Sequence, residues 1–254
     1  MKKVALISDL HSNLEALEAV LRHIADQGDV TSIYCLGDVV GYGPNPAEVI
    51  DLVREHCEFC LMGNHDMALT GMPLGFSGMA AQAIRWQRQM LEPRADSQVR
   101  VRERWAFIAS LAEQERIGDD WFVHASPRHP VTEYLLPWDV QGDPAKLNEA
   151  MALVTGHCFV GHTHMPGVFT TGPRFQSSAE LHNEYVFAPG QNAIVNVSSV
   201  GQPRDRDPRA CYATVTDAGV TWCRVEYDIE KTIAKVMAIP ELDARCGLRL
   251  RDGR

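Results

Sequence analysis

The sequence lacks a long hydrophobic run, an internal repeat and any excess of positive charge. No uninterrupted apolar stretch approaches the roughly 18 residues that a membrane-spanning helix requires, so we expect no membrane association. The formal net charge is −9, from 24 Lys and Arg against 33 Asp and Glu. A protein of this charge lacks the basic face that non-specific nucleic-acid binding requires, so stable nucleic-acid binding is not expected.

Disulfide bonds and an export signal are also not expected. The seven cysteines are odd in number and irregularly spaced, which favours reduced thiols. Cys57 and Cys60 have the spacing of a redox motif, but buried or half-buried thiols are the simpler interpretation. The apolar run that begins at Val4 is too short for the core of a signal peptide. We therefore expect a cytoplasmic protein.

Apolar patterning predicts alternating strands and helices in the first quarter of the chain. Residues 3–7, 31–36 and 58–62 are typical of strands, and residues 12–25 and 46–56 of helices, with Ser12 or Asn13 as the first N-cap. Such β-α-β alternation implies parallel strands. From residue 121 onward strands dominate, with a hairpin turn at 217–219 and a closing helix at 229–237; the predicted strands are 121–123, 158–160, 168–171, 185–188, 193–197, 211–216 and 220–227.

We expect one domain over residues 1–240. Residues 66–112 are predicted to be mostly helical, and we interpret them as an insert or cap on that domain. Residues 241–254 form a C-terminal tail, and its Arg-rich part from Arg245 is expected to be frayed or loosely docked.

Five short blocks place residues that bind metal or phosphate at the ends of predicted strands. Together they supply seven Asp, Asn and His ligands and one further histidine, which is the inventory of a two-metal hydrolase. In open α/β sheets functional residues lie beyond the carboxyl ends of the strands. The blocks are Asp9-Leu10-His11, Gly37-Asp38-Val39-Val40-Gly41, Gly63-Asn64-His65-Asp66, Val123-His124 and Gly161-His162-Thr163-His164.

The residue types in these blocks suit two metal ions about 3.5 to 4 Å apart, which need a bridging carboxylate. Asp38 is the candidate bridge. Asp9 and His11, two residues apart, can both reach one ion, and His162 and His164 repeat the arrangement.

Residues 64–66 combine a neutral ligand with a candidate acid. Asn64 supplies an oxygen without adding another anion. His65 is expected to point away from the metals and to protonate a leaving oxygen, with Asp66 or another carboxylate fixing its tautomer.

In this order the blocks resemble the motif series of the calcineurin-like metallophosphoesterases, over residues 9–164. The chain is most similar to the small bacterial and archaeal branch with Gly-Tyr-Gly-Pro-Asn-Pro after the second block, here residues 41–46. The resemblance implies an α/β (α+β) fold of the metallo-dependent phosphatase type, a four-layer α-β-β-α sandwich with two mixed β-sheets.

The resemblance also implies the ligand sets and the general acid. One ion would be held by Asp9, His11, Asp38 and His164, the other by Asp38, Asn64, His124 and His162, and His65 would be the acid. Mixed nitrogen and oxygen ligands suit Mn, Fe, Zn, Co or Ni better than Mg or Ca. The identity of the two divalent ions stays open.

Substrate contacts are less well defined by the sequence. Arg204 is a candidate because a guanidinium grips phosphate oxygens bidentately, although it could equally be one more solvated charge. Tyr42 and Asn45 are candidates for the substrate pocket, or else turn residues. Relatives often carry glycine where this chain has Ser198, which puts a tight backbone feature there in question.

The hypothesis is hydrolysis of a phosphorylated small molecule or nucleotide by a hydroxide that bridges the two metals. A phosphodiester substrate is slightly favoured by the bacterial relatives. Phosphomonoesters, dinucleoside polyphosphates and phosphoproteins stay open, and so does the oligomeric state. A non-catalytic binding scaffold of the same fold is disfavoured because no ligand is missing.

Overall fold

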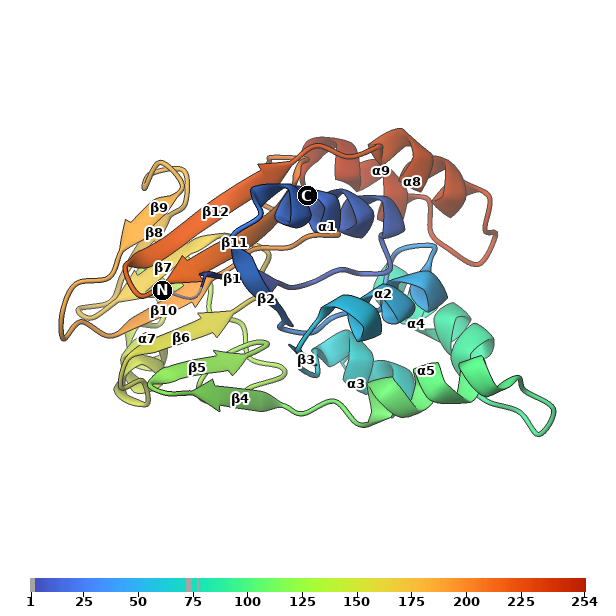
Figure 1. Cartoon of the computed structure of the whole chain (residues 1–254), viewed down its shortest axis with the longest axis horizontal. Helices are drawn as coiled ribbons and strands as arrows, with labels where there is room; N and C mark the ends of the chain where they lie inside the picture. Colours follow the sequence, from blue (N-terminus) through green and yellow to red (C-terminus); the bar gives the residue numbers. More distant parts are fainter. Residues whose placement is uncertain (1–2, 72–74, 77) are drawn as a thin grey trace.

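Two β-sheets pack face to face and carry helices on their outer faces (Figure 1). Our computed structural model describes residues 3–71, 75–76 and 78–254, and within them each sheet has six strands. The first sheet has the order β3 (Phe59–Cys60), β2 (Val30–Cys35), β1 (Lys3–Ile7), β11 (Ala210–Thr216), β12 (Gly219–Val225) and β9 (Glu184–Val186). The second has the order β4 (Gln114–Ile117), β5 (Asp120–Val123), β6 (His157–Val160), β10 (Ala193–Asn196), β7 (Gly167–Thr170) and β8 (Arg174–Ser177).

Both sheets are mixed, and their parallel strands share a direction within each sheet. Strand β1 runs parallel to β2 and β2 to β3, while β5 runs parallel to β6 and β6 to β10. The remaining pairs are antiparallel, including the β11–β12 hairpin predicted at residues 217–219. The carboxyl ends of the parallel strands therefore form one edge of each sheet, where loops of both sheets can meet.

Helices cover the outer face of each sheet and complete the four layers. Helices α1 and α2 and the segment α3 to α5 share a core with β1, β2 and β11, while α7 packs on β5, β6 and β7. This confirms the predicted α-β-β-α sandwich. The helices are α1 (Leu14–Gln27), α2 (Pro46–His56), α3 (Asn64–Thr70), α4 (Gly78–Leu91), α5 (Val99–Ala109), α6 (Asp139–Gly142), α7 (Pro144–Ala152), α8 (Ile229–Met237), α9 (Arg245–Leu248) and the 3-10 helix η1 (Arg249–Asp252).

The core between the sheets is filled by large apolar side chains from both of them. Leu6 and Tyr34 of the first sheet face Phe122, Phe159 and Val195 of the second. Rings of Phe122 and Phe159 stack with their centroids 5.2 Å apart. Because the outer faces are also covered, the central strands are apolar on both sides, which explains their uninterrupted hydrophobic runs.

Two local predictions, the N-cap of the first helix and the closing helix, are confirmed. Asn13 caps α1, its side chain accepting a hydrogen bond from Ala16 N at 3.2 Å, and α8 spans the predicted closing helix. All seven cysteines are free thiols, of which Cys57 and Cys60 are half-buried. None of the helices in the described ranges is long and apolar enough to cross a bilayer.

The C-terminal segment differs from its prediction. It is helical in α9 and η1 rather than frayed, and Cys246 and Leu250 are buried against Val236 and Leu242. Helices α3 to α5 lie in the segment interpreted as an insert; residues 72–74 and 77 of that segment lie outside the described ranges, and the capping role stays a prediction.

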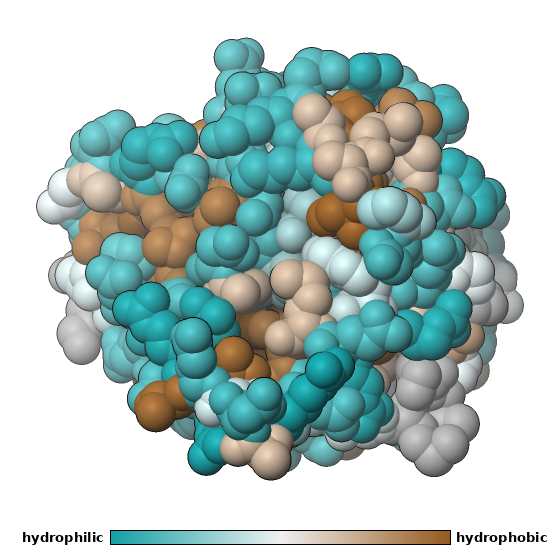
Figure 2. Space-filling view, turned by 90° about the vertical axis from the view of Figure 1, so that its right-hand side faces the viewer, coloured by the Kyte–Doolittle hydropathy of each residue, from teal (hydrophilic) through white to brown (hydrophobic). Residues whose placement is uncertain are grey.

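The end of the molecule formed by these helices carries several separate hydrophobic patches. Figure 2 shows this face, with brown areas divided by hydrophilic side chains. The helices α4 and α8 contribute exposed apolar residues, Met90 and Met237. Such scattered apolar surface is ordinary for a folded protein.

Candidate metal centre

The five sequence blocks meet where the two sheets come together. Each lies directly after the carboxyl end of a parallel strand, as the β-α-β pattern predicts. Asp9 and His11 follow β1, Asp38 follows β2, Asn64 begins α3 after β3, His124 follows β5, and His162 and His164 follow β6.

The side chains form two adjacent groups that could each hold a metal ion. Asp9, His11 and His164 place one ligand atom each within 4.8 Å of the others. Asp38, His124 and His162 do the same. All six side chains are buried.

The carboxylate of Asp38 lies between the two groups. Its Oδ2 is 3.7 Å from Nε2 of His11 and 3.6 Å from Nε2 of His124. Its Oδ1 is fixed by a hydrogen bond from the backbone N–H of His65 at 2.8 Å. One oxygen is thus held by the backbone while the other faces both histidine groups, which is the arrangement a bridging carboxylate needs.

Three histidines have their Nδ1 atoms occupied by backbone carbonyl oxygens. A carbonyl oxygen only accepts, so the proton of each neutral ring lies on Nδ1 and the lone pair lies on Nε2. The pairs are His11 with Val40 at 3.0 Å, His124 with Leu36 at 2.9 Å and His164 with Gln202 at 2.5 Å.

The freed Nε2 atoms point at other acceptors. Nε2 of His11 and Nε2 of His164 are 3.1 Å apart, and Nε2 of His124 is 3.3 Å from Oδ1 of Asn64. Within the described residues, Oδ1 of Asp9 and Nε2 of His162 are buried without a hydrogen-bond partner. Lone pairs that face each other repel unless a cation lies between them, so these residues fit divalent metal ions.

The pKa shifts agree with a site built for cations. Burial and the neighbouring carboxylates of Asp9 and Asp66 raise the pKa of Asp38 well above its usual range. Burial lowers the pKa values of His11 and His162 well below their usual range, so both rings are neutral near pH 7. Neutral imidazole is the form that binds metal.

Backbone strain is concentrated at the same residues. Five of the seven candidate ligands have positive φ, the left-handed region that most residues avoid: Asp9 (54°), His11 (46°), Asp38 (54°), His162 (65°) and His164 (60°). Ser198 also has a positive φ, of 81°, so this chain keeps the tight backbone feature without glycine. Such strain gathers at functional sites, where the surrounding fold holds it in place.

Two motif glycines make room for the carboxylates. A Cβ atom at Gly63 would overlap the carboxylate of Asp38, and one at Gly161 would overlap that of Asp9. The glycines of these blocks are therefore required by close packing around the ligands.

His65 lies beside the candidate metal ligands. Its ring centroid is 4.8 Å from that of His11, and its nitrogen can join a group with His11 and Asp38. Tyr42 and Phe76 pack on the ring, each with its centroid 4.7 Å away, and hold it beside the cluster. The expectation that the ring points away from the metals stays a prediction.

Asp66 does not fix the tautomer of His65. Its carboxylate accepts hydrogen bonds from the backbone N–H groups of Val39, Val40 and Gly63, at 3.3, 3.2 and 3.0 Å. These bonds tie the second block to the third. Burial nevertheless raises the pKa of Asp66 to about 6.

Of the three candidate substrate residues, two lie at the site. The ring of Tyr42 is 4.9 Å from that of His11, and the guanidinium carbon of Arg204 is 5.9 Å from the Tyr42 ring centroid. Asn45 is turned toward α8 instead, where its Oδ1 accepts a hydrogen bond from Lys235 at 2.9 Å. The structure therefore does not bring Asn45 into the cluster.

Sequence reasoning missed two further residues beside the ligands. The ring of Tyr134, 45% exposed, lies on the ring of His162 with centroids 3.9 Å apart. Buried Gln87 of α4 accepts from Gly41 N at 2.7 Å and donates to Gly43 O at 2.8 Å, which fixes the loop that carries Tyr42. Neither residue belongs to a motif.

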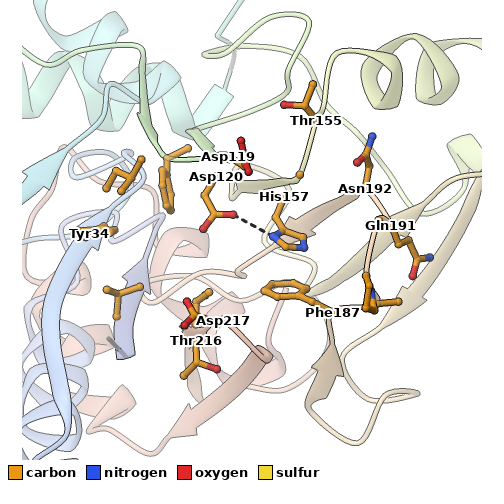
Figure 3. A pocket seen from close by; sticks show the side chains of 18 residues that line it. Tyr34, Asp119, Asp120, Thr155, His157, Phe187, Gln191, Asn192, Thr216 and Asp217 are labelled. Atoms are coloured by element: carbon orange, nitrogen blue, oxygen red, sulfur yellow. Dashed lines mark hydrogen bonds and ion pairs between the residues drawn. The ribbon is translucent and has the colours of Figure 1, made fainter. Parts of the chain in front are cut away.

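A cavity that is separate from the ligand cluster lies between the sheets near the start of β1 and β6 (Figure 3). It is a cavity of about 630 Å³ lined by Tyr34 and Phe122 from the inter-sheet core and by the loop 187–192. In it His157 stacks on Phe187, with ring centroids 3.6 Å apart, and pairs with Asp120 at 3.1 Å. The histidine and the carboxylate in this cavity, His157 and Asp120, therefore already have partners.

Comparison with known proteins decides the family. A family model described as calcineurin-like phosphoesterase matches residues 2–166. The chain belongs to this family. It is accordingly a metal-dependent phosphoric ester hydrolase, as the motif series predicts.

Two relatives of this phosphoesterase align over most of their length, and a third aligns over about a quarter. The protein MJ0912 of Methanocaldococcus jannaschii is 35% identical, over 92% of this chain and 91% of the relative. The crystal structure of a metallophosphoesterase from Sphaerobacter thermophilus, also 35% identical, covers 100% of this chain and 99% of its own with a TM-score of 0.80. A symmetrical bis(5'-nucleosyl)-tetraphosphatase of Erwinia tasmaniensis is 31% identical over 28% of this chain and 26% of its own.

Proposed function

We propose that this phosphoesterase hydrolyses a phosphodiester at a centre of two divalent ions, with His65 as general acid. The observation that carries the proposal is the position of Asp38 Oδ2, at nearly equal distances from the two histidine groups. A single-metal site would leave one of these groups of lone pairs uncompensated.

The ligands divide between the two ions as the geometry groups them. One ion would be held by Asp9, His11, Asp38 and His164, and the other by Asp38, Asn64, His124 and His162. When bound, the ions would lower the pKa of a shared water and neutralise charge on the phosphate oxygens. The mixed donor set favours Mn, Fe, Zn, Co or Ni.

His65 would move the proton that the leaving oxygen needs. Its Nδ1 is buried without a partner in the described residues, and a Cβ at Gly41 would overlap it. We therefore expect the ring to present Nε2 to the substrate. Burial and then Arg204 lower the pKa of His65 well below its usual range, so the resting ring is neutral. An incoming phosphate anion acts in the opposite direction and favours the protonated, acidic form.

A second candidate function is hydrolysis of dinucleoside polyphosphates. The Erwinia tasmaniensis relative is a symmetrical tetraphosphatase, although it matches a small part of the chain. The half-exposed ring of Tyr134 beside His162 also offers a surface on which a base can stack. Phosphomonoesters and phosphoproteins are the remaining substrate classes to compare.

The test is metal reconstitution followed by a substrate screen. Protein loaded with Mn, Fe, Zn, Co or Ni should bind two ions per chain by elemental analysis and should turn over bis-p-nitrophenyl phosphate. The screen compares p-nitrophenyl phosphate, cyclic nucleotides, dinucleoside polyphosphates and phosphopeptides under the same conditions. Protein that holds two ions and turns over none of these substrates would contradict the proposal.

A further inference from the structure

An exposed aromatic ring lies directly on one of the candidate metal ligands. The ring of Tyr134 packs on that of His162 with the centroids 3.9 Å apart and an interplanar angle of 35°. His162 is 3% exposed, whereas Tyr134 is 45% exposed. One side of the Tyr134 ring therefore covers the ligand, and a large part of the rest of the ring meets solvent.

Tyr134 belongs to the boundary between the ligand cluster and solvent. Of the seven candidate ligands, six are buried and Asn64 is half-buried. Tyr42 and Arg204 beside the cluster are also half-buried, so Tyr134 is the most exposed of these four boundary residues. A substrate reaches the buried ligands from solvent, and therefore past side chains of this boundary.

The other aromatic ring at the boundary is less available than that of Tyr134. The ring of Tyr42 lies 4.9 Å from that of His11, and the guanidinium carbon of Arg204 lies 5.9 Å from the same Tyr42 centroid. Among the described residues, the aromatic neighbour of Tyr134 is His162. Tyr134 therefore keeps ring surface on which another flat ring can stack.

The loop that carries Tyr134 is held in place on both sides of the ring. Before it, the carboxylate of Glu133 accepts a hydrogen bond from Ser126 Oγ at 2.6 Å. The carbonyl oxygen of Tyr134 itself accepts one from Lys146 Nζ at 3.1 Å. After it, Leu135 is buried in the core that α7 shares with β5 and β6. The ring is thus presented from a fixed backbone, which reduces the entropy lost when a ligand binds to it.

We propose that Tyr134 stacks on an aromatic group of the substrate, such as a nucleobase, while the phosphate lies at the metal centre. The proposal rests on the proposed function, and it narrows the substrate class to nucleotide-like phosphoesters, whatever their number of phosphates. Stacking on an aromatic side chain tolerates every base, because each base has a flat π-face. We therefore expect selection for an aromatic group rather than for one particular base.

The experiment compares two ligands that differ by the base alone. Metal-loaded protein is titrated by isothermal titration calorimetry with adenosine 5'-monophosphate and with ribose 5-phosphate, and its metal content is measured again afterwards. We expect wild type to bind the nucleotide about fivefold or more tightly than the sugar phosphate. Tyr134→Phe keeps the ring and should keep this affinity ratio.

Two variants without the ring test the stacking itself. Tyr134→Leu keeps an apolar side chain and should lose most of the affinity ratio. Tyr134→Gln also removes the ring, and it serves if the leucine variant does not fold. A general disturbance of His162 would weaken both ligands equally and leave the ratio unchanged, so the ratio separates stacking from a structural role.

Trp138→Leu is the matched control. Trp138 lies on the same loop, directly before α6, and is 59% exposed, so its replacement removes another exposed aromatic ring. The affinity ratio should stay as in wild type. Equal affinities in wild type, an unchanged ratio in the ringless Tyr134 variants, or an equal loss in Trp138→Leu would overturn the proposal.

Turnover of bis-p-nitrophenyl phosphate by wild type reports separately on the proposed function. Protein that keeps the affinity ratio without any turnover would contradict the hydrolysis and support the role of Tyr134. Protein that turns over the diester with an unchanged ratio in the ringless variants would do the reverse.

Discussion

The two ends of the β-sandwich differ: one end carries the cluster of buried candidate ligands, and the other carries a cavity. At the carboxyl ends of the parallel strands, buried acceptors of the described residues face one another at 3.1 and 3.3 Å with no donor between them. At the opposite end, the cavity of about 630 Å³ is far roomier, yet His157 already has Asp120 and Phe187 as partners. The end with the candidate ligand cluster therefore favours a bound ligand more strongly than the cavity does.

The comparison shows that buried acceptors without hydrogen-bond partners indicate a reactive site better than the volume of a cavity does. A cavity between sheets arises wherever loops do not close over the core. Acceptors such as Asp9 Oδ1 and His162 Nε2, buried without partners in the described ranges, cost free energy that only a bound ion offsets.

The largest expected effect comes from replacing the carboxylate between the two groups. In Asp38→Asn, turnover should fall by more than about 10³-fold, since the neutral amide cannot bridge two cations. The backbone bond from His65 to Oδ1 can persist, so the fold should be retained. Elemental analysis and circular dichroism check both parts. A variant that keeps two tightly bound ions and full activity would contradict the bridging role.

A smaller loss is expected when the proposed acid is replaced. His65→Gln should lower kcat by about 10²-fold, because the leaving oxygen loses its proton donor. The test is steady-state kinetics on bis-p-nitrophenyl phosphate beside elemental analysis. Activated leaving groups need less protonation, so the loss should be smaller for p-nitrophenol than for an alkyl ester. An equal loss for both leaving groups would argue against acid catalysis.

The buried histidines of the candidate metal centre should also make the metal-free protein less stable at acidic pH. The pKa values of His11, His162 and His164 are lowered in the folded state from the usual 6.5, mainly by burial. The unfolded chain therefore takes up protons first, so the free energy of unfolding should fall as the pH drops below about 6.5. The raised pKa of Asp38 opposes this trend in part. Urea unfolding of EDTA-treated protein between pH 7.5 and 5.5 measures the slope of the free energy of unfolding against pH.

A double variant identifies the origin of that slope. His11→Asn with His164→Asn should make it less steep, since two of the five buried histidines with lowered pKa values are then gone. Asparagine is suited to the left-handed backbone at both positions, which limits other effects. A slope that stays as steep as in wild type would place the acid sensitivity elsewhere.

The smallest effect is expected at the opposite end. Asp120→Asn breaks the pair with His157, but Asp120 is 38% exposed at its side chain, so the free energy of unfolding should change by less than about 1 kcal/mol. Activity should stay at the wild-type level. A loss of turnover as large as that of His65→Gln would show that the cavity takes part in the reaction.

Much of the site could be predicted from the sequence because its candidate ligands lie in short blocks directly after segments with clear strand patterns. Asp9 and Asp38 follow buried apolar strands, so parallel pairing brings them together. Tyr134 and Gln87 were missed because they reach the site from loop and helix positions with no local pattern. Asn45 was misplaced, since the loop alone does not show its bond to Lys235.

The fold was predicted less completely at its edges. All four residues of strand β4 are exposed, and its sequence Gln-Glu-Arg-Ile lacks the alternation that marks a half-buried strand. The helix α7 was not predicted either, although Asp143 caps it. The C-terminal segment was expected to be loose because its many arginines are typical of an exposed tail. Cys246 and Leu250 between them are nevertheless buried.

The left-handed backbone at five of the ligand positions limits which amino acids can replace them during evolution. Asparagine and glycine tolerate this conformation, whereas valine, isoleucine and threonine do not. An Asp-to-Asn exchange at position 9 or 38 therefore removes the charge of a candidate metal ligand at little cost to the backbone. Descendants of this enzyme can lose their chemistry while keeping their shape, which is a direct route from catalyst to binding protein.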